Sequence, residues 1–373
     1  MPIRAIFILF LIPVIAALPA PLLRTTAAPR TTVMPRTTAM PGVSRVIDSR
    51  TVMTAAGHSA PPAKIPVIFD TDFGPDYDDV GAITLLHAFA DSGMIEILAT
   101  GASCKHKNAA AALSVFNTYF KRPDLPIGVV KGNAVDIADW QHWTDTVIAR
   151  YPHRVGSNGQ TPDAVTLYRQ QLAGQRDHSV VMITVGFFTN MARLLQSGPD
   201  TLSPLSGTEL VKKKVLRLVS MAGRFPKGWE FNVDKDPPSS KWVFAHWPTP
   251  IIFSGWEIGS KIHCGLPLSH NEAIRHSPVK DVFSISIPMA KEDSAGRMSW
   301  DETAVLIAAA GWEKYYTLVP GRMICADDGS NDWDPRGDGH FYIKEKMPSD
   351  RVQAIIDQLI QHQPSKTGVR SPL

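Results

Sequence analysis

Residues 64–79 read KIPVIFDTDFGPDYDD, and this stretch decides the fold of the chain. A short apolar run, residues 65–69, leads into turn residues and five carboxylates: Asp70, Asp72, Asp76, Asp78 and Asp79. An apolar run that ends in Gly and Pro predicts a buried strand followed by a loop. The mostly apolar residues 80–90 then predict a helix, so the acids lie between the carboxyl end of a strand and the start of a helix.

The position of the acids at a helix start accounts for only part of the cluster. Asp78 and Asp79 would be stabilised there by the helix dipole and by free backbone N–H groups. The other three acids gain nothing from the helix, and crowded carboxylates repel one another unless a cation or protons lie among them. Because hard oxygen ligands at this place suit Ca²⁺ or Mg²⁺, the sequence predicts a divalent cation site.

The chain has 373 residues, of which 44% are hydrophobic, enough for one large domain or two smaller ones. Residues 1–20 combine Arg4 with an apolar run and small residues, which predicts a secretory signal peptide, with an uncleaved anchor as the alternative. We therefore expect a secreted, extracellular or periplasmic protein. Residues 21–62 repeat Arg-Thr-Thr with regular prolines and predict a disordered linker. The folded domain should span residues 63–363, followed by a flexible tail at 364–373.

Charge and cysteine content exclude several functions. The formal net charge is +3, but residues 1–60 hold six Arg and one Asp, so the remainder is slightly acidic. The basic character belongs to the N-terminal segment, and we expect no nucleic-acid surface on the domain. The three cysteines, Cys104, Cys264 and Cys325, are too far apart in sequence for a zinc knuckle or a redox pair.

The rest of the chain alternates apolar strands with helical segments. Strands are expected at residues 94–101, 125–130, 179–184, 215–221 and 249–253, with helices at 108–120, 161–172, 189–195, 237–246, 303–310 and 350–361. This alternation predicts an α/β domain with a mainly parallel central sheet. Sites in such sheets form at the carboxyl ends of the strands, and polar motifs follow several of the expected strands.

One of these motifs suggests sugar binding. Glu230 and Asn232 lie two residues apart in a segment expected to be extended, so their side chains should point the same way. A carboxylate beside an amide suits neighbouring sugar hydroxyls, because the first accepts and the second both donates and accepts hydrogen bonds. Asn108 and Asp301 each precede or begin an expected helix, where a capping role is the alternative to a role in the site.

Four ordered motifs together resemble the nucleoside hydrolases, the inosine-uridine-preferring nucleoside N-ribohydrolases. They are Asp70-Thr71-Asp72-Phe73-Gly74 with Asp78-Asp79, the strand and turn before Thr189-Asn190, Glu230-Phe231-Asn232 with Asp236-Pro237, and Trp300-Asp301. The resemblance extends over residues 64–361. The chain departs from the family pattern in three ways: Phe73 replaces a usual Pro, the Asp-rich loop is longer by two residues, and Trp300 replaces a His that some members carry.

The resemblance implies a Rossmann-like α/β fold and a Ca²⁺ ion bound by Asp72, Asp79, Asp301 and the backbone carbonyl of Val185. It also implies that Asp72 is the general base that activates a water molecule. The ribose hydroxyls would be held by Asp78, Asn108, Glu230, Asn232 and Asp301.

The leaving base is the least defined part of the implied site. An indole N–H donates hydrogen bonds but cannot give up its proton to a leaving base. Trp300 would therefore act by stacking on the base, which favours purine nucleosides. Trp140, Trp143 and Trp229 are further stacking candidates, and His106 is a candidate acid.

Two other hypotheses about the function remain open. Asp70-x-Asp72 after a strand also resembles the Mg²⁺-dependent phosphatases with an aspartyl nucleophile. A secreted nucleoside- or ribose-binding protein without turnover is the second. In every reading the partner is a small molecule, and the sequence leaves the oligomeric state open, with a homo-oligomer as one alternative.

Overall fold

The computed structural model describes residues 63–364. The expected signal peptide at 1–20, the linker at 21–62 and nearly all of the tail at 364–373 lie outside the described residues. Among the helices of the described part, none combines the length and apolar character needed to cross a membrane.

A ten-stranded sheet forms the centre of the described domain, in the order β3-β2-β1-β4-β5-β7-β12-β10-β11-β6. The strands from β3 to β12 in that order run parallel to their neighbours. Their bounds are β1 (Ile65–Thr71), β2 (Ile95–Ala102), β3 (Ile127–Val129), β4 (Val180–Thr184), β5 (Val215–Met221), β7 (Ile251–Ser254) and β12 (His340–Glu345). The predicted α/β fold with a mainly parallel sheet is confirmed.

The sheet continues at one edge as an antiparallel extension, which the sequence analysis did not predict. It consists of β10 (Tyr316–Cys325), β11 (Ser330–Asp334) and β6 (Lys227–Trp229), each antiparallel to its neighbour. Pro320 and Gly321 interrupt β10, and both residue types are depleted in strands, so the apolar pattern there is weak. A separate two-stranded sheet joins β8 (His263–Cys264) to β9 (Arg297–Met298).

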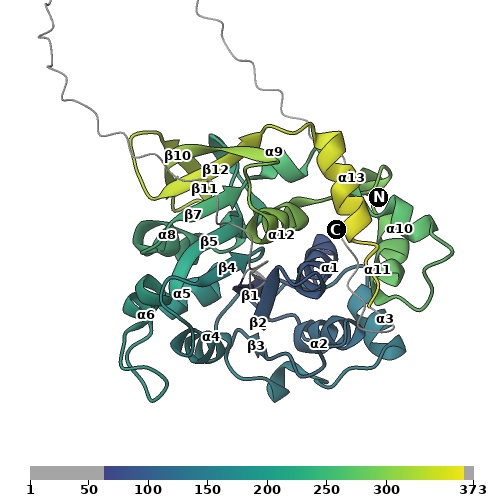
Figure 1. The fold of residues 1–373 in the computed structure, drawn as a ribbon, viewed down its shortest axis with the longest axis horizontal. Helices are drawn as coiled ribbons and strands as arrows, with labels where there is room; N and C mark the ends of the chain where they lie inside the picture. The colour runs from purple at the N-terminus through teal and green to yellow at the C-terminus, as the bar shows by residue number, and fades with distance from the viewer. Residues whose placement is uncertain (1–62, 365–373) are drawn as a thin grey trace, which may run out of the picture. The chain divides into compact units, whose positions relative to one another are not determined.

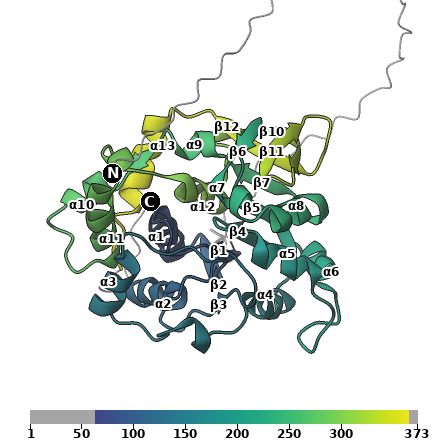
Figure 2. The ribbon, with the colours of Figure 1, turned by 180° about the vertical axis from the view of Figure 1, so that it is seen from behind.

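Helices cover both faces of the sheet (Figures 1 and 2). One face carries α1 (Asp78–Asp91), α2 (Ala109–Tyr119), α3 (Trp143–Arg150), α11 (Pro278–Ser286), α12 (Trp300–Ala310) and α13 (Ser349–Leu359). The other carries α4 (Ala164–Ala173), α5 (Thr189–Gln196), α6 (Gly207–Lys214) and α8 (Pro237–His246). Three short helices are α7 (Phe231–Lys235), α9 (Trp256–Gly259) and α10 (Leu266–His270).

Each face of the sheet has its own hydrophobic core. Val67 and Phe69 of β1 pack with the helices of one core, and Ile68 packs with those of the other. Because both faces are covered, residues 66–71 are buried without alternation, which is typical of a central parallel strand. The carboxyl end of β1 therefore opens into the interior of the domain, where α1 and α12 begin side by side.

Candidate active site

Two aromatic side chains anchor the loop between β1 and α1. Phe73 is fully buried, with ring centroids 5.4 Å from Phe116 and 5.3 Å from Trp143. Tyr77 donates its hydroxyl to Asp293 at 2.6 Å. A large apolar side chain at position 73 thus fills a space between α2 and α3, which explains why Phe is tolerated at this place in the motif.

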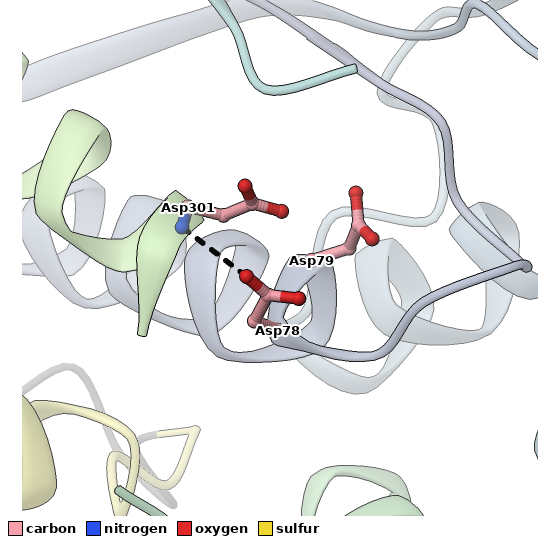
Figure 3. A group of neighbouring side chains, drawn as sticks. All are labelled: Asp78, Asp79 and Asp301. Carbon is pink, nitrogen blue, oxygen red and sulfur yellow. Dashed lines mark hydrogen bonds between the residues drawn. The ribbon is translucent and has the colours of Figure 1, made fainter. Parts of the chain in front are cut away.

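Three carboxylates meet where α1 and α12 begin, as Figure 3 shows. Asp78, Asp79 and Asp301 each offer an oxygen, and these oxygens lie within 4.8 Å of one another. The backbone N–H of Asp301 donates to Asp78 at 3.4 Å. One oxygen of Asp79 accepts from the hydroxyl of Thr71, and the other has no hydrogen-bond partner among the described residues.

The electrostatics of the three carboxylates, Asp78, Asp79 and Asp301, favour the binding of a cation among them. Burial raises the pKa of Asp79 to about 7 and raises the pKa values of Asp78 and Asp301 well above their usual range. Neighbouring carboxylates raise the pKa values further. An unpartnered buried oxygen among crowded carboxylates fits a divalent cation with oxygen ligands.

Asp72 lies beside this group rather than within it. Its side chain is buried in the wall of the same pocket, and burial followed by the charge of Asp79 raises its pKa well above the usual range. The thiol of Cys104 donates to its backbone carbonyl at 3.1 Å. The structure therefore brings Asp78, expected at the sugar, into the carboxylate group and leaves Asp72, expected as a ligand, next to it.

Glu230 itself is extended, but α7 begins at the next residue, so the expectation that Glu230 and Asn232 lie together in an extended segment is wrong. Glu230 is the N-cap of α7, and its carboxylate accepts from the backbone N–H groups of Asn232, Gly223 and Val233 at 2.9, 3.0 and 3.3 Å. Asn232 lies in the first turn of α7. The hydrogen bonds from free backbone N–H groups to the Glu230 carboxylate stabilise the helix start, so the chain is helical after Glu230 and not extended.

The Val185 carbonyl is held by Asn232. The side-chain amide of Asn232 donates to the carbonyl oxygens of Val185, at 3.0 Å, and Met221, at 3.1 Å. Val185 follows β4, and Met221 ends β5. A carbonyl oxygen has two lone pairs, so this bond leaves one for a cation.

A cavity of ≈ 500 Å³ gathers most of the predicted residues. Its wall includes Asp72, Asp78, Val185, Glu230, Asn232, Trp300 and Asp301. These residues come from all four motifs and lie at the ends of different strands, as expected for an α/β site. The volume is in the usual range for a small-molecule pocket.

Aromatic side chains form another part of the wall, through Trp229, Phe231, Trp256 and Trp300. The indole N–H of Trp300 donates to the backbone carbonyl of Trp256 at 2.9 Å, so the indole is fixed with its polar edge satisfied. Trp256 was not among the residues predicted from the sequence, although it lies two residues after β7, where a site residue is expected.

Several candidates do not lie in the pocket wall. Asn108 instead donates to Thr144 at 3.1 Å and to Asp145 at 2.8 Å, so its side-chain amide is bonded outside the pocket wall. Trp140 and Trp143 are also outside the wall.

His106 has a structural role in place of the expected catalytic one. A Cβ atom on Gly74, whose φ is +140°, would lie 2.5 Å from the His106 ring, so the two residues are tightly packed. The imidazole also bonds to the hydroxyl of Thr144 at 3.1 Å. Burial lowers its pKa and so disfavours the protonated form that a general acid needs.

Two charged residues near the carboxylates were missed. Arg297 lines the pocket and donates to Asp78 at 2.9 Å. Glu302 is fully buried, and neither of its carboxylate oxygens has a hydrogen-bond partner among the described residues. Neither residue belongs to a motif that could have revealed it.

Comparison with known proteins agrees with the geometry. The family model described as "Inosine-uridine preferring nucleoside hydrolase" matches residues 67–346. A comparison with curated proteins found no significant match.

Solved structures share the fold at low sequence identity. A purine-preferring ribonucleoside hydrolase from Gardnerella vaginalis is 14% identical with a TM-score of 0.63, covering 79% of this chain and 99% of that one. An inosine-uridine preferring nucleoside hydrolase from Bacillus anthracis is 15% identical with a TM-score of 0.61, covering 80% and 99%. A plant nucleoside hydrolase is 17% identical with a TM-score of 0.61, covering 81% and 99%. The match to the family model over most of the chain, with this shared fold, shows that the chain belongs to the inosine-uridine preferring nucleoside hydrolase family and is a hydrolase acting on N-glycosyl bonds.

Proposed function

We propose that this protein hydrolyses the N-glycosidic bond of purine ribonucleosides in a Ca²⁺-dependent reaction that gives ribose and the free base. One observation carries the proposal. The wall of a single pocket of ≈ 500 Å³ contains both buried carboxylates and three indoles. The carboxylates suit a cation and a sugar, and the indoles suit a flat base.

The cation would be held by oxygen atoms alone. Asp79 and Asp301 supply carboxylates, Asp78 belongs to the same group with Asp72 beside it, and the Val185 carbonyl has a free lone pair. An all-oxygen set of this kind suits Ca²⁺, which accepts varied geometry. Bound there, the cation supplies positive charge that makes a water molecule easier to deprotonate.

Asp72 is the proposed general base. Its carboxylate lies in the pocket wall beside the other carboxylates, and burial, followed by the charge of Asp79, raises its pKa, which makes it a stronger base than an exposed Asp. Asp72 would take the proton of the attacking water. The other carboxylates would hold the ribose hydroxyls and place negative charge near the sugar as it becomes cationic.

Stacking supports the preference for purines. Trp229 and Trp256 line the pocket together with Trp300, whose N–H is already used inside the protein. A purine offers a larger aromatic face to these rings than a pyrimidine does.

The position of Asp70 argues against the phosphatase alternative. A phosphatase of that type needs an exposed aspartyl nucleophile, but Asp70 is fully buried. Its carboxylate accepts from Tyr168 at 2.5 Å and from Asn190 at 2.7 Å. Asp70 therefore has a structural role near the carboxyl end of β1, where its carboxylate is bonded inside the protein and is not free to act as a nucleophile.

A panel of ribonucleosides, assayed for free ribose with and without a chelator, tests the proposal. We expect release from inosine or guanosine to exceed release from uridine, and to stop when the chelator is added. Tight nucleoside binding without ribose release would instead support the binding protein. Release of phosphate from a phosphomonoester would support the phosphatase.

Export is a separate part of the proposal. Residues 1–20 have the features of a secretory signal, and we expect the mature chain to begin after them. N-terminal sequencing of protein recovered outside the cytoplasm tests this, and recovery of the intact N-terminus inside the cell would contradict it.

A further inference from the structure

Arg297 is a buried guanidinium in the wall of the pocket, and the motifs described above assign it no role. One of its terminal nitrogens donates to Asp78 at 2.9 Å and also pairs with Asp76. The other terminal nitrogen lies 3.7 Å from Asp293. A single cation therefore links three carboxylates at the edge of the cavity.

Two aromatic rings fix the plane of this guanidinium. Its central carbon lies 4.9 Å from the ring centroid of Tyr77 and 5.1 Å from that of Trp300. Both distances are within the range of cation–π attraction. A planar cation held between two rings keeps its N–H groups in a fixed direction, which a flexible ammonium would not do.

The partners of Arg297 include the residues that make this Asp-rich loop longer than usual. Asp76 and Tyr77 belong to the stretch between Gly74 and Asp78, and Tyr77 also donates to Asp293 at 2.6 Å. Asp293 and Arg297 precede α12 by a few residues. The longer loop and the segment before α12 thus hold each other through four side chains.

We propose that Arg297 is a positioning residue that fixes the Asp78 carboxylate for contact with the substrate. The longer loop supplies Asp76 and Tyr77, which hold Arg297 in place. The inference rests on the proposed function for the sugar-binding role of Asp78. One oxygen of Asp78 is bonded to Arg297, and the other accepts from the backbone N–H of Asp301 at a long 3.4 Å. With Arg297 removed, only the longer bond restrains the carboxylate, and the negative charges of Asp76 and Asp79 push it away.

Kinetics of Arg297→Met and Arg297→Lys test the proposal. Arg297→Met should lower kcat/KM for the best nucleoside by about 10- to 100-fold, as expected for one lost hydrogen bond to a charged group. Arg297→Lys keeps the charge without the planar fork and should recover part of the loss. Arg169→Met is the matched control, because Arg169 is equally buried but pairs with Asp200 away from the pocket. It should lower the thermal midpoint and leave kcat/KM unchanged.

A double-mutant cycle shows whether Arg297 acts through Asp78. The pair Arg297→Met with Asp78→Asn should lose no more activity than Asp78→Asn alone. Losses that multiply, or an Arg297→Met enzyme within about two-fold of wild type, would overturn the proposal.

Crystal structures of wild type and Arg297→Met give an answer that does not depend on turnover. We expect the Asp78 carboxylate to rotate away from Asp301 in the variant, and an unchanged carboxylate would overturn the positioning role. If wild-type protein releases ribose from no nucleoside, the proposed function fails. The two crystal structures then still decide whether Arg297 positions Asp78.

Discussion

The side-chain amide of Asn232 donates a hydrogen bond to the Val185 carbonyl oxygen at 3.0 Å. Val185 follows β4, and Asn232 lies in the first turn of α7, so the bond joins two separate parts of the pocket wall. It fixes the direction of the carbonyl that we propose as a ligand of the cation. A residue expected to bind sugar thereby holds one part of the proposed cation site.

Asn232→Leu should weaken both the fold and the cation site. The change leaves the carbonyl oxygens of Val185 and Met221 without their buried donor, at a cost of about 1–3 kcal/mol in the free energy of unfolding. Ca²⁺ affinity, measured by calorimetry, should fall as well. Asn117→Leu is the control, because Asn117 is equally buried but bonds to His87 and Thr100. Equal Ca²⁺ affinities in the two variants would contradict the orienting role.

Asp72→Asn should abolish turnover while the fold is kept. The amide has the same shape but cannot take a proton from water, so ribose release should fall by about 10²- to 10⁴-fold. Circular dichroism should match wild type. The exposed Asp327→Asn serves as a control with the same chemical change on the surface, and it should keep full activity. Turnover near the wild-type rate in Asp72→Asn would remove Asp72 from the mechanism.

Asp79→Ala should reduce Ca²⁺ affinity by at least about tenfold, because it removes a charged oxygen ligand from a small set. Calorimetric titration of chelator-treated protein measures the change. The loss should also lower activity at limiting Ca²⁺ and be partly restored by excess Ca²⁺. An unaltered dissociation constant would show that Asp79 is not a ligand.

Glu230 should make stability depend on pH. Burial raises its pKa from the ordinary 4.5 to about 7, although three backbone N–H groups lower it. Because the folded pKa lies above the unfolded one, the stability due to Glu230 is full below about pH 4.5 and is lost as pH rises through 7. The unfolding free energy of wild type relative to Glu230→Gln should therefore fall between pH 5 and 8, measured with urea in the presence of chelator. A difference that grows with pH would contradict the sign.

The parts of the fold that the sequence revealed have local causes. The bounds expected for β5 and α8 agree with the structure, because a continuous apolar run marks the first and Pro237 marks the start of the second. Asp163 caps α4 by accepting from the backbone N–H groups of Val165 and Thr166, within the segment 161–172 that was expected to be helical. Signals of this kind depend on neighbours in the chain and can be read without a structure.

The features that escaped prediction depend on distant partners. β11 pairs with both β10 and β6, and its residues, Ser330–Asp334, are too polar to indicate a strand on their own. Arg297 meets Asp78 across 219 positions of sequence, so no local pattern marks it. Asn108 shows the same dependence on distant partners, because its place after a strand suggested the pocket, whereas its side chain bonds to Thr144 and Asp145 of α3.

The antiparallel extension also sets the order in which the site can be completed during synthesis. β6, which precedes Glu230 directly, joins the sheet only through β11, and β11 joins only through β10. In a chain that emerges from the ribosome, the acidic loop after β1 is therefore synthesised long before β10 and β11, the strands through which β6 joins the sheet. The part of the pocket wall next to β6 can fold only after β10 and β11 have been made, because pairings between distant segments form late. A nascent or C-terminally clipped chain would hold the acidic residues in an unfinished pocket, so catalytic competence should be acquired only once translation is nearly over.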